Sequence, residues 1–527
     1  MNTETINKVM STNSEKSLRV LMEMRPAMDG FAGIPQEARL LFRGLRMLDG
    51  IEAEGMIQTS MRTLAKGTSN KKSFFEPDLT PARKINRYSR VIISIAEKPF
   101  RTIFDKIHDY VQKGVSSAQL TFGTLLGINS IKLTKFESQY FEDFTWRTFF
   151  AKTLPASDFK LVATANQQIC STPWHTMHMV GLSTLNILHT PRYPYVDTDS
   201  IDIFIAQTPY PGRISKSTKF VVRYHDALPV LMPHTISDKS LHQATHFYAL
   251  MSNVKSGAYF ACVSETTRQD LIKLFPEAAA KAITIHNMVS HHYYDEASPA
   301  TLVPNIIRSR QYKKFEDEAK AYALVPEFLT LREKENFYAK HVKPGIKYLL
   351  MVSTVEPRKN HTRLLAAWEV LKADIDPDLK LVIVGTLGWD YATTAKSFSP
   401  WIDRGEVFML NQVPSPDLRV LYKHAAVTVC PSLGEGFDYS GVEAMRSGGV
   451  VTSSDIAVHR EIYEDASDYF DPYSTMSLVN SIKSILYADT AAEKQTALRS
   501  HGAEVSARYL PDVILPKWNE FLKKIAA

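Results

Sequence analysis

Cysteine and long apolar runs are both scarce in this chain of 527 residues. The three cysteines, Cys170, Cys262 and Cys430, lie far apart, which excludes a disulfide framework or a zinc site of paired cysteines and favours a reducing compartment. No stretch approaches the roughly 20 apolar residues of a membrane-spanning helix, and the polar first residues lack the apolar core of a signal peptide. We therefore expect a cytoplasmic protein, either soluble or associated with the inner face of the cytoplasmic membrane.

Neither sign of charge dominates, because the net charge is only +6. This mild basicity favours anionic partners such as phosphates, but it is too weak to indicate a nucleic-acid partner. The histidines within 175–178 and 291–292 lack a third ligand at a suitable spacing, and a pair such as Asp197 and Asp199 is common in polar loops. We therefore expect neither a metal ion nor another cofactor.

The order of the apolar segments indicates an α/β protein. A short strand at 18–24 leads into a loop with Gly30 and Gly33 and then a helix, which is how a nucleotide-binding α/β domain begins. Strands and helices alternate again between 202 and 287, and a second series starts at 347–355. We expect two doubly wound Rossmann-like domains that face each other across a cleft, where ligands bind at the carboxyl ends of the strands.

The same alternation predicts the domain boundaries. Residues 1–343 are assigned to the N-terminal domain, with insertions at about 60–195 and 290–343. Residues 344–505 form the C-terminal domain, and 506–527 form a terminal helix that we expect to pack back onto the N-terminal domain.

One part of the first insertion, 82–113, interleaves basic and apolar residues at near-helical spacing. Such a helix either lies on an anionic membrane surface or packs its apolar side on the domain. We favour packing, because long basic helices usually solvate one side and bury the other. Peripheral contact with an anionic membrane is the alternative.

The segment "STVEPRKN" (353–360) directly follows a strand and carries two adjacent cations, Arg358 and Lys359. It lies at a strand-to-helix turn, and the N-terminus of a helix favours anions. Two cations at this position would form a clamp for a diphosphate. The alternative, that this is only a charged surface turn, is equally compatible with the segment on its own.

The segment "GEGFDYSGVEAMRSGG" (434–449) places Glu435 and Glu443 on either side of a glycine-containing turn. It leads from the apolar strand 426–432 into a helix whose first backbone N–H groups, about 439–442, are expected to be free for an anion. A capping or helix-dipole role would explain Glu443, but it fits Glu435 poorly because Glu435 precedes the turn. A glycosidase-like acid–base pair is a further option, although both carboxylates would lie on one wall beside the expected phosphate site.

Taken together, these segments resemble the retaining glycosyltransferases of family 4, which have the GT-B fold. Residues 345–490 follow that family's pattern closely and in order, with "STVEPRKN", "LKLVIVG", "PSLGEGFDYSGVEAM" and "SDIAVHREI". The N-terminal half matches more loosely, through the glycine loop, "VVRYHDALPV", "CVSETTRQDL" and "ITIHN". The resemblance implies an N-terminal domain that binds the acceptor and a C-terminal domain that binds a nucleotide-sugar donor.

The resemblance also implies roles for individual residues. Lys359 and Arg358 would bind the donor diphosphate and Glu443 the ribose, while Glu435 would lie near the sugar hydroxyls and the reacting centre. His225 would approach the donor sugar, although a histidine at a strand end is also compatible with a core position. We assign Glu435, His225 and Lys359 as catalytic. The remaining donor-binding residues are Gln412 and Val413 at the nucleobase, Gly30 and Gly33 near the diphosphate and acceptor, and Asp438, Tyr439, Ser440 and Gly441 near the sugar.

The chain departs from the family pattern in three ways. Thr354 stands where members often carry an arginine, so one phosphate-binding cation is either missing or supplied by Arg358. Asp438, Tyr439 and Ser440 replace the usual Gly-Leu-Pro, and the sugar preference is expected to depend on them. The N-terminal domain is also longer than usual, which weakens any inference about the acceptor.

The resemblance implies a retaining transfer of a hexose or deoxyhexose, with mannose from GDP-mannose favoured. The acceptor would be a saccharide or lipid-linked saccharide in the synthesis of surface polysaccharide or lipopolysaccharide. Neither a metal nor a cofactor is implied. Two other functions stay open: a nucleotide-sugar epimerase-like enzyme of the same general fold, and a non-catalytic carbohydrate-binding subunit.

Overall fold

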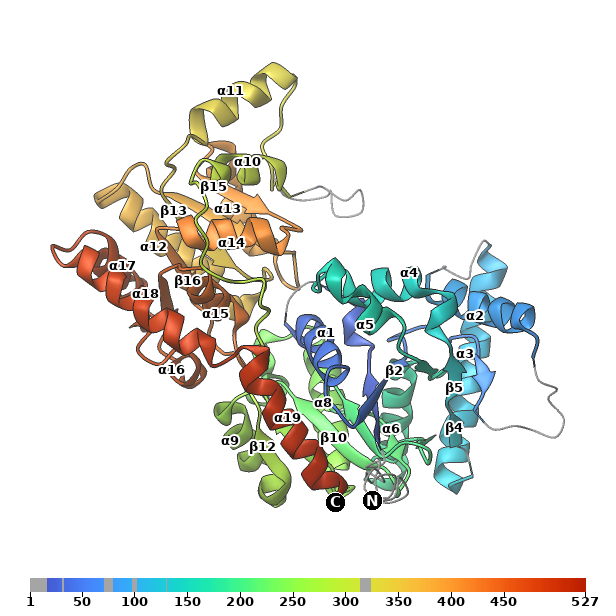
Figure 1. Cartoon of the computed structure of the whole chain (residues 1–527). Helices are drawn as coiled ribbons and strands as arrows, with labels where there is room; N and C mark the ends of the chain where they lie inside the picture. The colour runs from blue at the N-terminus through green and yellow to red at the C-terminus, as the bar shows by residue number, and fades with distance from the viewer. Residues whose placement is uncertain (1–16, 31–32, 71–78, 97–101, 129, 313–323) are drawn as a thin grey trace, which may run out of the picture.

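The computed structural model describes residues 17–30, 33–70, 79–96, 102–128, 130–312 and 324–527 (Figure 1). The strands are β1 (Leu18–Glu23), β2 (Ile51–Ile57), β3 (Thr68–Ser69), β4 (Ser130–Lys132), β5 (Thr134–Phe136), β6 (Gln167–Ile169), β7 (Tyr195–Asp197), β8 (Ile203–Ala206), β9 (Arg213–Ile214), β10 (Lys219–Tyr224), β11 (Tyr259–Cys262), β12 (Ala282–Thr284), β13 (Tyr348–Val352), β14 (Lys380–Val384), β15 (Val407–Leu410), β16 (Val427–Cys430), β17 (Val451–Ser454) and β18 (Ser467–Phe470).

The α-helices cover both faces of the two large sheets (Figure 1). They are α1 (Ile34–Leu45), α2 (Pro81–Ala96), α3 (Ile103–Leu126), α4 (Glu142–Thr145), α5 (Phe159–Ala163), α6 (Trp174–Leu188), α7 (Leu228–Leu231), α8 (Lys239–Lys255), α9 (Glu265–Leu274), α10 (Leu302–Ser309), α11 (Leu331–His341), α12 (His361–Asp374), α13 (Ala392–Asp403), α14 (Ser415–His424), α15 (Tyr439–Arg446), α16 (Ala457–Tyr463), α17 (Thr475–Leu486), α18 (Ala491–Ala507) and α19 (Pro511–Ala526).

Both large sheets have doubly wound topology. The C-terminal sheet has the order β15-β14-β13-β16-β17-β18, and the N-terminal sheet has the order β12-β11-β10-β8-β1-β2-β6-β5-β3. In each sheet the first strand of the domain, β13 or β1, has later strands on both sides. Paired strands are parallel in both, except where β5 pairs with β6 and β3. The predicted fold of two doubly wound Rossmann-like domains is confirmed. A reversal of strand order of this kind leaves a crevice at the carboxyl ends of the strands.

The central strands form where apolar residues follow one another, so that both faces of the strand are mostly apolar. The segment LRVLME of β1 and the segment YLLMV of β13 are almost entirely buried. Parallel strands with helices on both faces require this composition, because neither face meets water. Both central strands therefore end in the interior of the protein, and the residues that follow them are directed towards the space between the domains.

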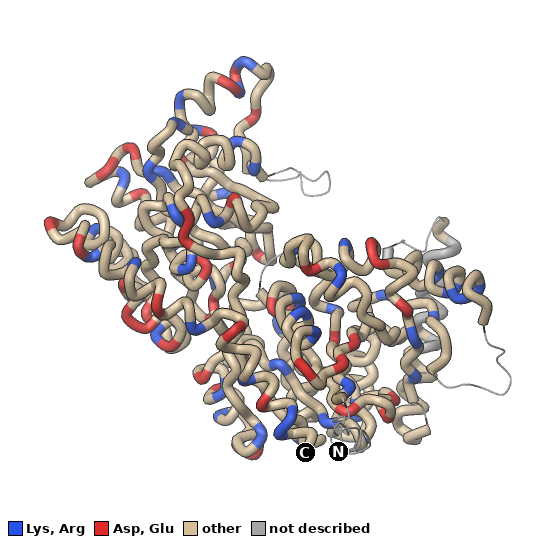
Figure 2. The backbone as a smooth tube through the Cα atoms, in the orientation of Figure 1, with Lys and Arg blue, Asp and Glu red and all other residues tan. Residues whose placement is uncertain are grey.

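The amphipathic segment 82–113 forms α2 and the start of α3, apart from 97–101, which lie outside the described residues. Tyr88 and Val91 of α2 are buried in the N-terminal core, as the packing interpretation predicts. Basic residues lie along α2, at the right of Figure 2. Contact of this helix with an anionic membrane stays a prediction.

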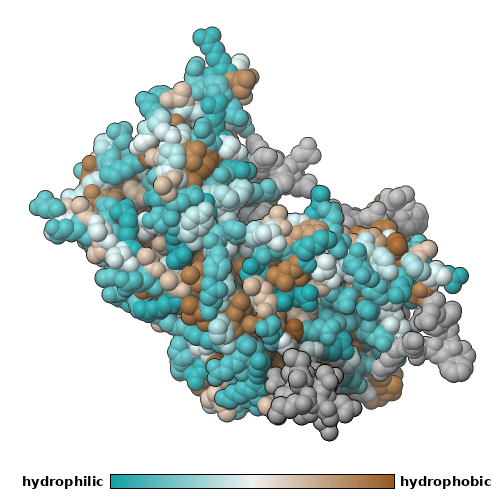
Figure 3. Space-filling view, in the orientation of Figure 1, coloured by the Kyte–Doolittle hydropathy of each residue, from teal (hydrophilic) through white to brown (hydrophobic). Residues whose placement is uncertain are grey.

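None of the helices that the structure describes is long and apolar enough to cross a membrane. The face of the molecule seen in Figure 3 is mostly hydrophilic, and its apolar side chains lie in small separate groups. The visible surface therefore offers no broad apolar area, and the large apolar clusters are inside the two domains.

The packing of α10 and α11 corrects one predicted boundary. The sequence analysis assigned residues 290–343 to the N-terminal domain as an insertion. Val303 and Ile307 of α10 and Tyr338 of α11 are instead buried in the same cluster as strands of the C-terminal sheet. Both helices lie against the C-terminal domain in Figure 1. This segment has no strong periodicity, so its apolar residues do not reveal which domain they contact.

The chain returns to the N-terminal domain at its end. Helix α19 runs beside α1 and β10 (Figure 1), and its side chains Ile514 and Trp518 are fully buried in the N-terminal core. The guanidinium of Arg223, on β10, lies 5.2 Å from the centre of the Trp518 ring. The last helix thus closes one side of the domain whose first strand is β1.

Candidate functional site

A cavity of about 440 Å³ lies between the domains, at the carboxyl ends of both parallel sheets. Its walls include the ends of β10, β13 and β14 and the start of α15. Of the residues predicted from the sequence, Gly441 alone does not line it and instead packs against the Tyr463 ring. The predicted residues that line it are Gly30, Gly33, His225, Arg358, Lys359, Gln412, Val413, Glu435, Asp438, Tyr439, Ser440 and Glu443.

The two cations of the "PRKN" turn contact the first glutamate of the opposite loop. The Lys359 ammonium lies 2.5 Å from one Glu435 oxygen, and Arg358 Nη1 lies 2.7 Å from the other. Arg358 Nε also contacts Glu356 at 2.6 Å. Asn360 fixes the turn, because it adopts a left-handed conformation and donates to the Pro431 carbonyl at 3.1 Å. The cations are therefore directed into the cavity, which favours the clamp over a charged surface turn.

Burial and charge act in opposite directions on this cluster. Burial alone would raise the pKa of the Glu435 carboxyl, but the charges of Arg358 and Lys359 outweigh it and hold the pKa below its usual range. Burial would likewise lower the pKa of Arg358, yet Glu435 and Glu356 hold it above its ordinary value. Both partners are therefore ionised near neutral pH. The carboxylates of Glu435 and Glu356 are the ion-pair partners of the two cations, and a bound anion would have to replace them.

The start of α15 differs from the prediction in one respect. Asp438 has a left-handed backbone, with φ of 61°, and its Oδ1 accepts from the Ser440 amide at 3.2 Å and the Ser440 hydroxyl at 2.7 Å. The prediction that the amides of 439–442 are all free is therefore wrong for Ser440. Aspartate is a preferred N-cap residue because its carboxylate accepts from these first amides, so Asp438 itself was the signal for this capping.

Glu443 is buried where the two domains touch. Its carboxylate accepts from Gln36 of α1 at 2.9 Å and from the Tyr422 hydroxyl at 3.2 Å. A second hydrogen bond crosses the domains beside it, from the Tyr439 hydroxyl to Glu37 at 2.9 Å. Burial raises the pKa of Glu443 to about 7. The residue is thus held by the N-terminal domain, which a simple helix-capping role would not require.

Replacing Glu443 with glutamine is expected to stabilise the protein in a pH-dependent way. Because the pKa is about 7 in the folded protein against an ordinary 4.5, the folded state disfavours the charged form. This cost is absent below about pH 4.5, grows up to about pH 7 and reaches about 3 kcal/mol above it. Thermal melting of Glu443→Gln should show a gain over wild type at pH 8 that vanishes near pH 4.5. The exposed Glu504→Gln is the control, and an equal gain at both pH values would contradict the argument.

His225 follows β10 and contributes a neutral ring to the cavity wall. Burial, with the charge of Arg223 adding to it, lowers the pKa of His225 to about 3, so the ring is uncharged near neutral pH. Its Nε2 is buried and has no hydrogen-bond partner among the described residues. An unpaired polar atom at the wall of a cavity is available to a ligand. The neighbouring Asp226 forms a turn, accepting from the Leu228 amide at 3.0 Å.

Two glycine positions and one glutamine depend on left-handed backbone. Gly33, with φ of 70°, immediately precedes α1, and Gly30 has φ of 22°. Residues 31–32 between them lie outside the described residues. Gln412 has φ of 52° and lines the same cavity as Val413. These loops bring backbone groups from both domains to one cavity, as the resemblance implied.

No group of three or more His, Cys, Asp or Glu side chains within the described ranges is arranged to hold a metal ion. His178, of the 175–178 histidines, is buried and its ring lies 4.0 Å from the Trp174 ring. It therefore has a packing role. The expectation that the protein needs no metal stays a prediction.

Known proteins resemble this chain in sequence. Residues 333–504 match the family model "Glycosyl transferases group 1". The "O-antigen chain mannosyltransferase B" of Escherichia coli is 26% identical over 260 residues, which are 49% of this chain and 57% of the relative. The "O-antigen chain mannosyltransferase RfbU" of Salmonella typhimurium is 24% identical over 268 residues, which are 51% and 65%. The match thus leaves more than a third of each of these two relatives uncovered.

The whole chain also resembles a solved structure. The sucrose-phosphate synthase of Thermosynechococcus elongatus superposes with a TM-score of 0.52 and 14% identity, over 96% of this chain and 99% of that one. At this identity the likeness concerns the fold alone. It supports the predicted GT-B arrangement of two Rossmann-like domains, with the cavity of this chain between them.

Proposed function

We propose that this protein is a retaining glycosyltransferase that transfers mannose from GDP-mannose to a saccharide acceptor. The observation that carries the proposal is the cluster of Lys359, Arg358 and Glu435 in the interdomain cavity. Two half-buried cations at a strand-to-helix turn suit a diphosphate, and a carboxylate beside them suits sugar hydroxyls. The cluster lies in the segment that matches the group 1 model.

We assign a part of the donor to each wall of the cavity. The diphosphate would displace Glu435 from Lys359 and Arg358, which then stabilise the charge that develops on the leaving group. The freed Glu435 and the neutral His225 would hydrogen-bond the sugar. Glu443 would exchange its contact with Gln36 for the ribose hydroxyls. In a retaining transfer the acceptor approaches from the side of the departing phosphate, which takes its proton, so no protein base is assigned.

The acceptor is proposed from the relatives. Both are named as O-antigen chain mannosyltransferases, so we propose a saccharide or lipid-linked saccharide of a surface polysaccharide. The proposed place of action is the cytoplasm, at the inner face of the membrane where such a precursor would be exposed. No metal or cofactor enters the proposal.

Binding and transfer assays test this function. Among GDP, UDP, dTDP and their sugars, GDP-mannose should raise the melting temperature most, because a ligand that binds only the folded state stabilises it. With GDP-mannose and a mannose-containing oligosaccharide, the product should carry an α-linked mannose and GDP should be released. Conversion of the nucleotide sugar without an acceptor would indicate an epimerase-like enzyme instead. Binding without turnover would indicate a non-catalytic subunit.

A further inference from the structure

We propose that Asp438 selects the donor sugar by accepting a hydrogen bond from one of its hydroxyl groups, and that the buried His459 positions Asp438 to do so. This inference rests on the proposed function and concerns the same cavity. Asp438 stands where the family pattern has glycine, so the contact would belong to this chain and not to the family in general.

The contacts that Asp438 makes with the described residues leave one acceptor position of its carboxylate open. Its Oδ1 accepts twice, from the amide and the hydroxyl of Ser440, and its Oδ2 accepts once, from His459 Nε2 at 3.2 Å. A carboxylate has about four lone-pair sites, so one on Oδ2 stays open. The side chain is 6% exposed and lines the cavity. Asp438 thus offers an acceptor position at the wall of the cavity that a donor sugar would occupy.

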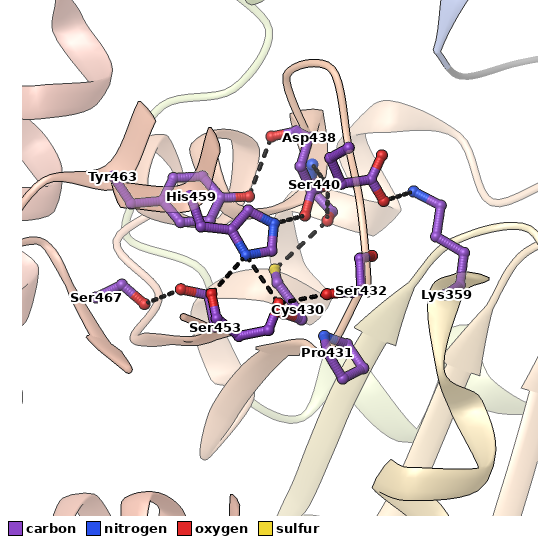
Figure 4. A network of polar contacts seen from close by, with 12 residues as sticks. Lys359, Cys430, Pro431, Ser432, Asp438, Ser440, Ser453, His459, Tyr463 and Ser467 are labelled. Atoms are coloured by element: carbon purple, nitrogen blue, oxygen red, sulfur yellow. Dashed lines mark hydrogen bonds and ion pairs between the residues drawn. The ribbon is translucent and has the colours of Figure 1, made fainter. Parts of the chain in front are cut away.

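His459 is enclosed in a rigid frame behind Asp438 (Figure 4). Its ring is fully buried, and Nδ1 lies 2.9 Å from the Ser454 carbonyl oxygen. The Tyr463 ring stacks on it with centroids 5.0 Å apart, and the Tyr463 hydroxyl donates to the Asp438 carbonyl at 3.1 Å. His459 therefore holds the side chain of Asp438 and Tyr463 holds its backbone, and both residues belong to α16.

The contacts of His459 fix the orientation of its ring. Nε2 donates to Asp438 Oδ2, because a carboxylate only accepts, and Nδ1 lies 2.9 Å from the carbonyl oxygen and 3.1 Å from the hydroxyl of Ser454. Burial would raise the pKa of Asp438, but the hydrogen bond from His459 and the charge of Lys359 hold it far below its usual range, so Asp438 is a carboxylate. His459 therefore donates to an ionised partner, and this charge-assisted hydrogen bond holds the geometry of the pair.

This pairing explains how a carboxylate is tolerated beside a diphosphate site. An isolated carboxylate near Lys359 would repel the phosphates of the donor. The hydrogen bonds from His459 and Ser440 stabilise that charge in place, while the open lone pair on Asp438 Oδ2 keeps its ability to accept. Such a group favours an uncharged hydroxyl as its partner. A site built to bond a hydroxyl rejects the analogue that lacks it, because its own polar group is then left unpaired.

Deoxy donors test the contact directly. Full-length wild type, Asp438→Gly and Asp438→Asn are compared with GDP-mannose and its 2-, 3-, 4- and 6-deoxy analogues, by kcat/KM. Wild type should use one analogue at least ~100-fold less well than GDP-mannose. In Asp438→Gly that ratio should fall towards one, since GDP-mannose loses its bond and the analogue does not. Asp438→Asn keeps one amide oxygen that can accept and should show a smaller fall. Glycine and asparagine both tolerate the left-handed backbone of Asp438, so neither variant strains the loop.

His459 has its own readout as a positioning residue. His459→Gln keeps an N–H that can reach Asp438 and should retain most of the discrimination between hydroxy and deoxy donors. His459→Leu should lose it, while binding of GDP alone changes less than about threefold in either variant. If all donors suffered equally in His459→Leu, its role would be structural and the positioning claim would be overturned.

The outcomes separate the two proposals. If wild type transfers no mannose from GDP-mannose, the proposed function fails and the inference fails with it. If wild type transfers mannose but Asp438→Gly shows the same deoxy penalties, the inference alone is overturned. Selective loss of one penalty in Asp438→Gly, with a smaller loss of the same penalty in Asp438→Asn, supports it and identifies the hydroxyl.

Discussion

Lys359→Ala is expected to lower kcat/KM for sugar transfer by about 100-fold or more while the protein stays folded. The Lys359 ammonium is only 14% exposed and is directed at Glu435 inside the cavity. In the proposed reaction it stabilises the charge that develops on the diphosphate, and loss of one such electrostatic partner typically costs this much. Transfer kinetics check the rate, and the affinity for GDP should fall more than that for GMP, which lacks the second phosphate.

The chain offers a matched control in Lys380→Ala. Lys380 is 12% exposed and pairs with Glu406 at 2.7 Å, but it lies outside the cavity. Both variants remove a half-buried lysine from an ion pair, so their effects on stability should be similar. If Lys359→Ala and Lys380→Ala lost the same amount of activity, the effect of Lys359 would be on the stability of the protein. If Lys359→Ala transferred sugar at the wild-type rate, Lys359 would have no role in the site.

The ion pairs of the same cluster explain how two cations are kept at the cavity wall in a position to bind an anion. Arg358 is shared between Glu435 and Glu356, and Lys359 pairs, within the part of the chain that the structure describes, with Glu435. Breaking a buried ion pair without replacement is costly, because it leaves a charge unpaired. In the proposed function a diphosphate would remove that cost by taking the place of the carboxylate. The carboxylate released in this exchange would then lie next to the sugar, where acceptors are needed.

The motifs that could be predicted are those that can be interpreted from one short segment and its neighbouring elements. The segments "STVEPRKN" and "GEGFDYSGVEAM" each join a buried strand to a helix, and parallel strands end at the same edge of a sheet. This is why Lys359 and Glu435, far apart in sequence, were expected in one cavity. The core packing of α2 could also be predicted from its own segment, because helical periodicity shows which side of the helix is apolar.

Contacts between domains could not be predicted in this way. Gln36 and Glu443 are brought together by the packing of α1 on α15, and nothing in either segment indicates the other. The bond from Tyr439 to Glu37 depends on the same docking. His459 lies in the quoted segment "SDIAVHREI", but nothing in that segment indicates its contact with Asp438, which precedes another helix. Sequence patterns describe one element at a time, whereas these bonds depend on how two folded domains meet.

Gly436→Ala is expected to reduce transfer by about 100-fold or more through the relation between the two domains. A β-carbon at Gly436 would lie 1.8 Å from the backbone oxygen of His225, which belongs to the other domain. Neither backbone can yield locally, so the domains must separate or the end of β10 must shift. Either change moves His225 away from Glu435, and a displacement of about 1 Å at a reacting centre costs roughly this much. Kinetics with saturating donor would measure the loss.

Gly434→Ala is the matched control, because it lies in the same loop and also faces the N-terminal domain. Its β-carbon would meet Met232 Sδ at 2.8 Å and Leu228 Cδ2 at 2.9 Å, which are the ends of flexible side chains. These can rotate away, so a loss of less than about fivefold is expected. Neither glycine has a left-handed backbone, so alanine adds no conformational strain at either position. Equal losses in the two variants would mean that the loop, and not the approach of Gly436 to His225, limits activity. A large loss in Gly436→Ala alone would show that catalysis requires the two domains at their present separation.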